Sequence, residues 1–263
     1  MGDDPVPSLK GVAGENRTPA IQTVQRAAMI LSAFTVSRPH LTLNQLTASL
    51  GTSKATAHRY TKALRESNLL RYDEREALYS LGPQILTLSA AARVGMPVIG
   101  IAGPYMQRLV REIDETVVLS VWDGDTAVVV RVDDNTDRTI RVSVRMGSRL
   151  SRTESAQGRV FCAFLPPEDV PGLEAQLAAS PELRQELVKI REDNISANTP
   201  SVNGVRSIAS PVFRGPVLLA AMAIVGTTSS VPAGTHSPLA EALRQTAAEV
   251  TAELGREQNS PGH

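Results

Sequence analysis

Basic side chains recur at helical spacing in the stretch TSKATAHRYTKALRE, residues 52–66. Thr52 or Ser53 can cap a helix here, and on a helical wheel one face is apolar, formed by Ala57, Tyr60 and Leu64. The residues opposite are Ala55, His58, Arg59, Lys62 and Glu66. A solvated surface explains most such helices, but a row of cations on one face can also bind phosphate groups.

The segments before this helix predict the elements that position it. Apolar residues from Ile21 onward recur at three- and four-residue spacing and predict a first helix that ends near Arg38. Thr42 caps a short second helix, and Gly51 supplies the left-handed residue that ends it. Two helices joined by a tight glycine turn, the second of them basic, form a helix-turn-helix pattern.

A small β-hairpin is predicted directly after the basic helix. Asn68 can adopt the left-handed conformation that stops the helix, and the segments LLRY and LYSL alternate on either side of the charged turn DEREA. Arg71 and Arg75 lie at or near the hairpin tip. Together these elements predict a winged helix-turn-helix, whose second helix enters the DNA major groove and whose wing lies on the backbone or in the minor groove.

The distribution of charge fits this interpretation. The 263-residue chain has 27 Lys plus Arg and 27 Asp plus Glu, so it has no overall attraction for nucleic acid. Residues 21–81 contain eight basic and four acidic residues, whereas residues 82–263 contain 17 basic and 20 acidic residues. The basic character therefore belongs to the N-terminal third, and nucleic-acid binding is expected there alone.

Catalytic and metal-binding patterns are absent from the sequence. The four histidines, His40, His58, His236 and His263, do not stand at metal-ligand spacing from one another or from Cys162. Cys162 lies in the apolar helical segment GRVFCAFLP and is expected to be a core residue rather than a nucleophile. No glycine-rich phosphate-binding loop follows a strand. We therefore expect no enzyme, no metal site and no cofactor.

The sequence also suggests the cellular compartment. A single cysteine excludes an intramolecular disulfide and fits a reducing environment. No stretch of 18 apolar residues occurs, and residues 1–19 lack the apolar segment of a signal sequence. The expectation is a cytoplasmic protein with no membrane partner.

The remainder of the chain predicts an α+β domain. The helix QILTLSAAARV is expected to act as a linker that can pair with its copy in a dimer, and the next helix is expected to bend or restart at Gly103-Pro104. Strands are predicted for TVVLSVW, TAVVVRVD, TIRVSV, SIASPVF and VLLAAMAIVG, and helices near 153–165, 182–194 and 237–254. This order favours helices packed on a curved sheet.

Five regions follow from these predictions. They are a flexible arm over 1–19, a winged helix-turn-helix domain over 20–82, a linker helix over 83–97, an α+β domain over 98–255 and a flexible tail over 256–263.

Several motifs, in order and spacing, resemble the IclR family of bacterial transcriptional regulators. They are TVQRAAMILSAF, LTLNQLTASLGTSKATAHRYTKAL, LYSLGPQILTL, GSRLSRTESAQGRVFCAFLP, VNGVRSIASPVF and GPVLLAAMAIVG. The resemblance covers nearly all of 21–254. It implies a dimer or dimer of dimers whose N-terminal winged helix-turn-helix binds double-stranded operator DNA and whose C-terminal GAF-like domain binds a small organic effector.

The motifs and the resemblance together give two sets of site residues. The expected DNA-binding residues are Arg26, Thr42, Ser53, Lys54, Ala55, Thr56, His58, Arg59, Lys62, Arg71 and Arg75. The resemblance implies an effector site between the sheet and the loop that leads into TESAQGR, with the residues Val142, Leu150, Ala156, Gln157, Val205, Ser207, Ala223 and Val225.

The implied effector site is mostly apolar in this chain. Positions 223 and 225, which carry hydroxyl groups in many family members that bind small keto acids, are alanine and valine here. We expect a largely apolar or aromatic effector held by few polar groups such as Gln157 and Ser207. Core packing is an equally good explanation of each alanine and valine.

A second interpretation has no DNA partner. The α+β domain would be a ligand-binding or enzymatic domain, and the basic helices would form an appendage that binds protein. That protein would show no salt-dependent affinity for duplex DNA.

Overall fold

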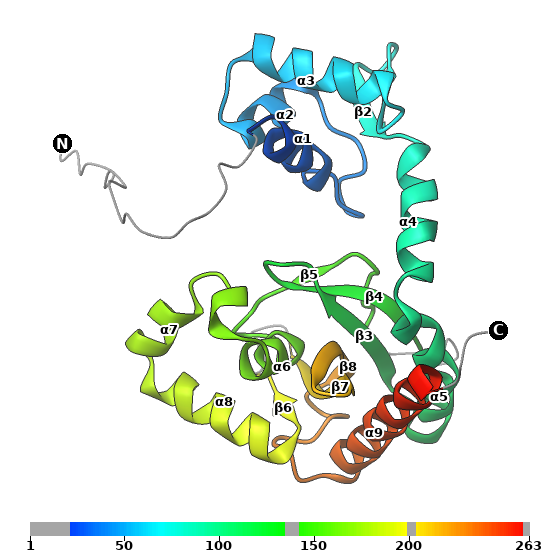
Figure 1. Ribbon diagram of the computed structural model, residues 1–263, viewed down its shortest axis with the longest axis vertical. Helices are drawn as coiled ribbons and strands as arrows, with labels where there is room; N and C mark the ends of the chain where they lie inside the picture. Colours follow the sequence, from blue (N-terminus) through cyan, green and yellow to red (C-terminus); the bar gives the residue numbers. More distant parts are fainter. Residues whose placement is uncertain (1–21, 135–141, 199–203, 260–263) are drawn as a thin grey trace. The chain divides into compact units, whose positions relative to one another are not determined.

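The computed structural model describes residues 22–134, 142–198 and 204–259 (Figure 1). The chain divides into two compact units: unit 1 ends at Gln84, and unit 2 comprises the chain from Ile85 onward together with Thr35–Ser37. The arm predicted over 1–19 lies outside the described residues.

Unit 1 is a three-helix domain with a β-hairpin. Its helices are α1 (Gln22–Ser32), α2 (Leu43–Leu50) and α3 (Lys54–Glu66), and its strands are β1 (Leu70–Asp73) and β2 (Leu78–Leu81). The strands pair with Tyr72 opposite Tyr79, and Leu41 adds a backbone bridge to Tyr79. One apolar cluster joins all five elements and contains Ile30, Phe34, Leu41, Leu46, Leu50, Ala57, Leu64, Leu70 and Tyr79.

α1 differs from its prediction both in where it ends and in which residues it buries. α1 ends at Ser32, well before Arg38, because β-branched Thr35 and Val36 and the residue before Pro39 all disfavour helix. Phe34 still reaches the core from beyond the helix end. Val24, which fits the apolar stripe by spacing, is 64% exposed.

Unit 2 is built on one antiparallel sheet of six strands. In chain order they are β3 (Thr116–Trp122), β4 (Ala127–Asp133), β5 (Arg149–Leu150), β6 (Ser196–Ala197), β7 (Val205–Arg214) and β8 (Val217–Thr227). Their order across the sheet is β5-β4-β3-β8-β7-β6. The two central strands, β3 and β8, are distant in sequence, so the sheet forms only when the two halves of the unit meet.

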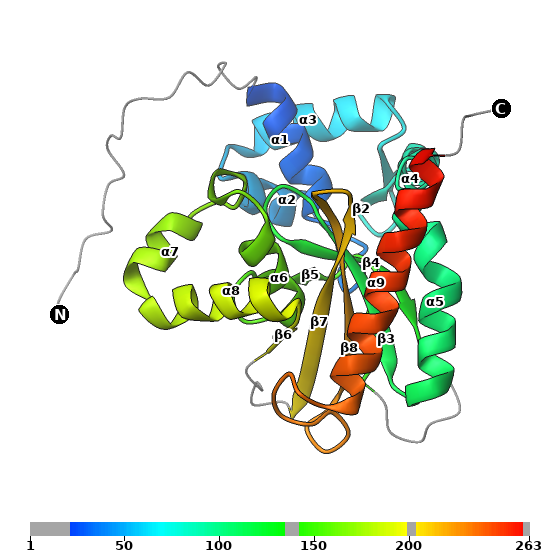
Figure 2. The same cartoon turned by 60° about the horizontal axis from the view of Figure 1, so that its bottom comes forward.

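Helices cover both faces of this sheet (Figure 2). α5 (Pro97–Ile113) and α9 (Pro238–Asn259) pack on the face that carries Val117, Leu119 and Met222. α6 (Ala156–Phe164), α7 (Leu173–Ala179) and α8 (Pro181–Asp193) belong to the cluster on the opposite face. We call this opposite face the α6 face. The predicted α+β class with helices packed on a curled sheet is confirmed.

Two helices differ from their predicted bounds. α5 runs unbroken through Pro104, whereas a bend or restart was expected there. The carbonyl that Pro104 leaves without a partner belongs to Gly100, which is exposed and can bind water. α9 continues to Asn259, so residues 256–259 are helical although a tail was predicted from residue 256.

The linker helix α4 (Gln84–Val94) has no buried residue. No single described helix is long and apolar enough to cross a membrane. Only α4 and α5 taken together have the length and composition of a span, and they meet at a bend of 76°.

The segment TIRVSV was predicted to be a strand, but its described part, Val142–Val144, is irregular. β5 comes later and has two residues, which pair with Ala127 and Val128. The first half of the segment lies outside the described residues. α7 and a short 3₁₀ turn at Pro167–Asp169 were not predicted.

Candidate DNA and effector sites

Local side-chain caps fix the helix-turn-helix. Thr42 forms a capping box at α2: its Oγ1 accepts from the backbone N–H of Gln45 (3.3 Å), and its own N–H donates to Gln45 Oε1 (2.8 Å). Gly51 ends α2 in the left-handed conformation, with φ 58°. Ser53 then starts α3 by accepting from the backbone N–H of Thr56 (3.3 Å). The turn between the helices is therefore set by residues within a few positions of it.

The buried side of α3 determines which side is free to bind. Ala57, Thr61 and Leu64 are buried. At 100° per residue, the side directly opposite these three carries Ala55, Arg59, Lys62 and Glu66. Thr61 was not expected in the core; its hydroxyl is satisfied there by the carbonyl of His58 (3.0 Å) and by the Tyr79 hydroxyl (3.4 Å).

Tyr60 is half-buried rather than part of the core, because it lies on the flank of α3 that faces α1. Hydrogen bonds with the Thr23 side chain and with Arg26 lower the pKa of the Tyr60 hydroxyl below its ordinary value. Arg26, predicted from the sequence to lie near DNA, is thus brought to the side of α3.

The other flank of α3 meets the wing. The Arg65 guanidinium carbon lies 5.1 Å from the centroid of the Tyr72 ring on β1. Lys62 forms only a long, exposed ion pair with Glu66, at 3.9 Å. Arg71, expected at or near the hairpin tip, instead pairs with Ser80 close to the base of the hairpin. It is exposed there and borders the same surface as Lys62. Arg65 and Tyr72 are not among the residues predicted to bind DNA, because their contact depends on the hairpin folding back onto α3.

The wing tip is acidic. Asp73, Glu74 and Glu76 surround Arg75, and these three are among the four acidic residues of 21–81. Asp73 Oδ1 accepts from the backbone N–H groups of Arg75 (2.9 Å) and Glu76 (3.2 Å), which fixes this carboxylate in the turn. Arg75, a predicted DNA-binding residue, therefore stands in a locally negative environment.

Most of the predicted effector residues lie on the α6 face of unit 2. Ser207 pairs with Val225, and Val225 pairs with Thr116, so these three side chains share one row across β7, β8 and β3. Thr116 Oγ1 donates to the carbonyl of Val142 (3.1 Å), which brings Val142 to the end of that row. The next row contains Ala209, Ala223 and Val118. Val205, Ala156 and Gln157 complete the set, the last two as buried residues of α6.

Leu150 lies apart from this group along the strands. It pairs with Ala127, and Ala127 pairs with Trp122 at the opposite end of β3 from Thr116. The separation along β3 is roughly 20 Å at the rise of a strand. The predicted effector residues thus span the α6 face and do not form one compact set.

Three buried side-chain polar atoms lack a hydrogen-bond partner among the described residues: Ser120 Oγ, Trp122 Nε1 and Ser196 Oγ. Ser120 and Trp122 alternate with Val121 on β3, Ser120 pairs with Ala221, and Ser196 pairs with Ala209. All three side chains therefore lie on the α6 face of the sheet. None of the three was predicted as a site residue, although a serine among the apolar residues of a buried strand is a usable signal.

An arginine fixes the loop that precedes α6. Arg159, whose side chain is 11% exposed, donates to the carbonyls of Thr153 (2.5 Å) and Ala197 (2.8 Å) and pairs with Glu186 (2.7 Å). It thereby ties the loop before Ala156 to β6 and α8.

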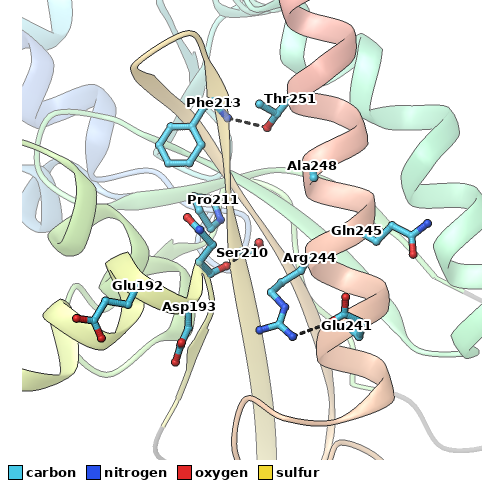
Figure 3. A pocket seen from close by; sticks show the side chains of 11 residues that line it. Glu192, Asp193, Ser210, Pro211, Phe213, Glu241, Arg244, Gln245, Ala248 and Thr251 are labelled. Carbon is cyan, nitrogen blue, oxygen red and sulfur yellow. Dashed lines mark hydrogen bonds and ion pairs between the residues drawn. The ribbon is translucent and has the colours of Figure 1, made fainter.

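A separate groove of about 840 Å³ lies at the β6 edge of the sheet, between the end of α8, β7 and α9 (Figure 3). None of the predicted effector residues lines it. β7 is protected from strand addition here, because Pro211 has no N–H and the Phe213 N–H donates to Thr251 Oγ1 (3.1 Å). Arg244 in this groove is paired with Glu241.

The described part of the chain holds neither a candidate metal cluster nor an activated cysteine. No group of three or more His, Cys, Asp or Glu residues that could hold a metal occurs there. Cys162 is buried, and burial raises the pKa of its thiol to about 11. A thiol with this pKa is protonated at neutral pH and is a poor nucleophile.

Both units match known families. Residues 23–74 match the IclR helix-turn-helix domain, and residues 90–252 match the bacterial transcriptional regulator IclR C-terminal domain. The HTH-type transcriptional regulator Rv1719 of Mycobacterium tuberculosis is 30% identical over 243 residues, which cover 87% of this chain and 91% of that protein.

Solved structures share the fold. A putative IclR transcriptional regulator from a Silicibacter species superposes with a TM-score of 0.78 at 25% identity, covering 89% of this chain and 96% of that one. An IclR homolog from Microbacterium hydrocarbonoxydans, complexed with 4-hydroxybenzoate, gives a TM-score of 0.72 at 20% identity, covering 90% of this chain and 100% of that one.

These matches agree with three features of the structure: a capped recognition helix with an outward basic face, a wing, and a curled α+β domain. The chain belongs to the IclR family of HTH-type bacterial transcriptional regulators.

Proposed function

We propose that this regulator reads its operator with the outward side of α3, where Arg59 and Lys62 stand beside Ala55. The observation that carries the proposal is the burial of Ala57, Thr61 and Leu64, which leaves the basic side exposed. Arg59 is long enough for a base edge or a phosphate, and Ala55 offers a methyl contact to thymine. Lys54, His58, Arg71 and the caps Thr42, Ser53 and Thr56 complete the expected interface, with Arg26 and Arg75 at its margins.

Operator selection tests this directly. Purified protein would be used to enrich fragments of the source organism's genomic DNA, and the affinity for the recovered sequence would be measured against salt. Arg59→Ala should weaken operator binding and lower the slope of log affinity against log salt by about 0.9 if it holds a phosphate, or relax specificity if it reads a base. Arg256→Ala, an exposed site on α9, is the matched control. Failure to enrich any sequence would refute the assignment.

We propose that the effector binds on the α6 face and is a small, largely apolar or aromatic molecule. The buried alanine-rich rows of β7 and β8 make this face apolar, and the unpaired atoms Ser120 Oγ and Trp122 Nε1 offer hydrogen bonds to an effector. A ligand oxygen that accepted a hydrogen bond from either atom would satisfy a group that otherwise costs about 1–3 kcal/mol to bury. Gln157 and Ser207 are the other polar candidates from the predicted set.

A variant of nearly unchanged shape separates binding from packing. Ser120→Ala removes an unpaired hydroxyl, so the unliganded protein should be as stable as wild type or more stable, while the thermal shift produced by the effector should fall. The control is Ser210→Ala, which loses a hydrogen bond to the carbonyl of Asn194 in the separate groove and should leave the effector shift unchanged.

The ligand panel would contain aromatic acids, including 4-hydroxybenzoate, together with esters, lactones, glyoxylate and pyruvate. Stabilisation by glyoxylate or pyruvate alone would refute the apolar class.

We propose that the active form is a homodimer or a dimer of dimers. On α4, the side chains of Leu86, Leu88 and Val94 are 74%, 50% and 83% exposed. The helix therefore carries apolar surface that no other part of the described chain covers. The linker helix of a second copy is the occupant we expect. Leu88→Lys should shift the mass measured by light scattering towards the monomer and weaken binding to a two-half-site operator. An unchanged mass would exclude α4 as the contact.

The proposed control mechanism is a population shift. The effector binds one arrangement of the assembled effector domains better than another, and the spacing of the paired recognition helices then changes relative to the operator half-sites. We expect regulation in the bacterial cytoplasm, without membrane attachment and without enzymatic activity. Absence of salt-dependent affinity for duplex DNA, together with an activity that survives neutralisation of Lys54, Arg59 and Lys62, would favour the alternative, a ligand-binding or enzymatic domain with a protein-binding appendage.

A further inference from the structure

A groove of about 580 Å³ lies within unit 1, between the C-terminal half of α3 and strand β1. Its lining residues are Lys62, Arg65, Glu66, Leu70, Arg71 and Tyr72. Half of them are cationic, and the one acid is held in the exposed pair with Lys62. An exposed pair of this kind contributes little stability, so Lys62 can leave it for a stronger anion.

One cation of the groove, Arg65, is held in place by an aromatic ring. Arg65 lies over the Tyr72 ring, and that ring is itself packed on Tyr79, with centroids 4.6 Å apart. A guanidinium that rests on an aromatic face keeps its N–H groups at its edge free for oxygen acceptors. Arg65 can therefore meet an anion without first losing the freedom of a mobile side chain.

The charge of the wing changes sign along its length. Outside the tip, residues 21–81 contain seven basic residues and a single acid, Glu66. The four tip positions, Asp73 to Glu76, contain three acids and Arg75. A DNA backbone passing the tip would meet these carboxylates, whereas at the base of the wing it meets Arg71 and Arg65.

We propose that this groove binds a backbone phosphate of the operator, held between Arg65 and Arg71, so that the wing grips DNA at its base rather than its tip. The proposal rests on DNA binding by α3 and extends it, since Lys62 belongs to both surfaces. Arg65 and Tyr72 become parts of the interface, and the contact is independent of base sequence.

The test compares the full-length wild type with Arg65→Ala in duplex binding between about 0.05 and 0.3 M salt. Loss of one phosphate contact should lower the salt slope by about 0.9, which corresponds to roughly eightfold weaker binding at 0.1 M salt, for operator and unrelated duplex alike. Arg65→Lys should recover most of the slope, and Tyr72→Phe, which keeps the ring, should behave as wild type. Arg75→Ala at the tip should change the slope by less than half as much.

Three results would overturn the proposal. In the first, Arg65→Ala keeps the wild-type slope while remaining folded by circular dichroism. In the second, Arg75→Ala lowers the slope more than Arg65→Ala does. In the third, Arg65→Ala loses affinity for inorganic phosphate alone with no change in duplex binding, which would make the groove a free-anion site. A wild type without duplex affinity would instead refute operator binding itself.

Discussion

Gly158 offers a sharp test of the packing of α6 on unit 2. A Cβ atom at this position would lie 2.2 Å from the carbonyl oxygen of Ser151 and 2.5 Å from that of Arg152. Both neighbours are backbone atoms, so either the loop or α6 must move. The loop is tied down by the hydrogen bonds of Arg159, and α6 is packed on the sheet.

Gly158→Ala should therefore destabilise unit 2 by about 1–3 kcal/mol, the usual cost of overpacking. For a unit of this size, that lowers the melting temperature by roughly 2–12 °C. Trp122 is the only tryptophan of the chain, and the centroid of its ring lies 5.5 Å from that of Phe161 on α6. Its fluorescence therefore reports on this packing.

The matched control is Gly100→Ala on the exposed side of α5, where an added Cβ meets no atom within 4 Å. This change should stabilise the helix by up to about 1 kcal/mol, because alanine loses less backbone entropy than glycine. Trp122 fluorescence would be followed during thermal unfolding. If Gly158→Ala unfolded at the same temperature as the wild type, the inferred close approach of the loop to α6 would be refuted.

Three further outcomes are expected. Ser53→Ala removes the cap of α3 and should cost unit 1 about 1 kcal/mol in chemical denaturation, whereas Ser49→Ala, whose hydroxyl only bonds back within α2, should change little. Arg159→Met leaves two carbonyls and Glu186 without their donor and should destabilise unit 2 by about 2–4 kcal/mol; a melt unchanged from wild type would contradict the role of Arg159. Cys162 should react with thiol reagents at pH 8 only after unfolding. Because folding raises the pKa of this thiol from 9.0 to about 11, its contribution to stability is complete below pH 9 and is lost between pH 9 and 11. Rapid labelling of the native protein would show that the thiol is accessible.

Much of unit 1 was predictable because its signals are local. Thr42, Ser53 and Gly51 act on backbone groups within a few residues of themselves, and each does so in the structure as the sequence indicates. Asn68 adopts the predicted left-handed conformation, with φ 56°. The strands of unit 2 were also predicted, because runs of β-branched residues form strands in many contexts.

Finer features of α3 could not be predicted from periodicity. Tyr60 and Thr61 lie on opposite sides of the stripe formed by Ala57 and Leu64 on the helical wheel. The wing and α1 decide which of them is buried: the Thr61 hydroxyl donates to the Tyr79 hydroxyl in the core, while Tyr60 bonds with Arg26 and is only half-buried. The basic groove at the wing base likewise exists only because Tyr72 is folded back to Arg65.

The sequence alone determined the identity of the caps, the basic face of α3, the place of most helices and strands along the chain, and the difference in charge between a basic N-terminal third and a mildly acidic remainder. These properties depend on residues close together along the chain. The tertiary structure alone decided that β3 and β8 are neighbours, which places Ser120, Trp122 and Ser196 on the face that holds most of the predicted effector residues. Strand pairing across about a hundred residues is set by packing of the whole unit, and no local pattern encodes it.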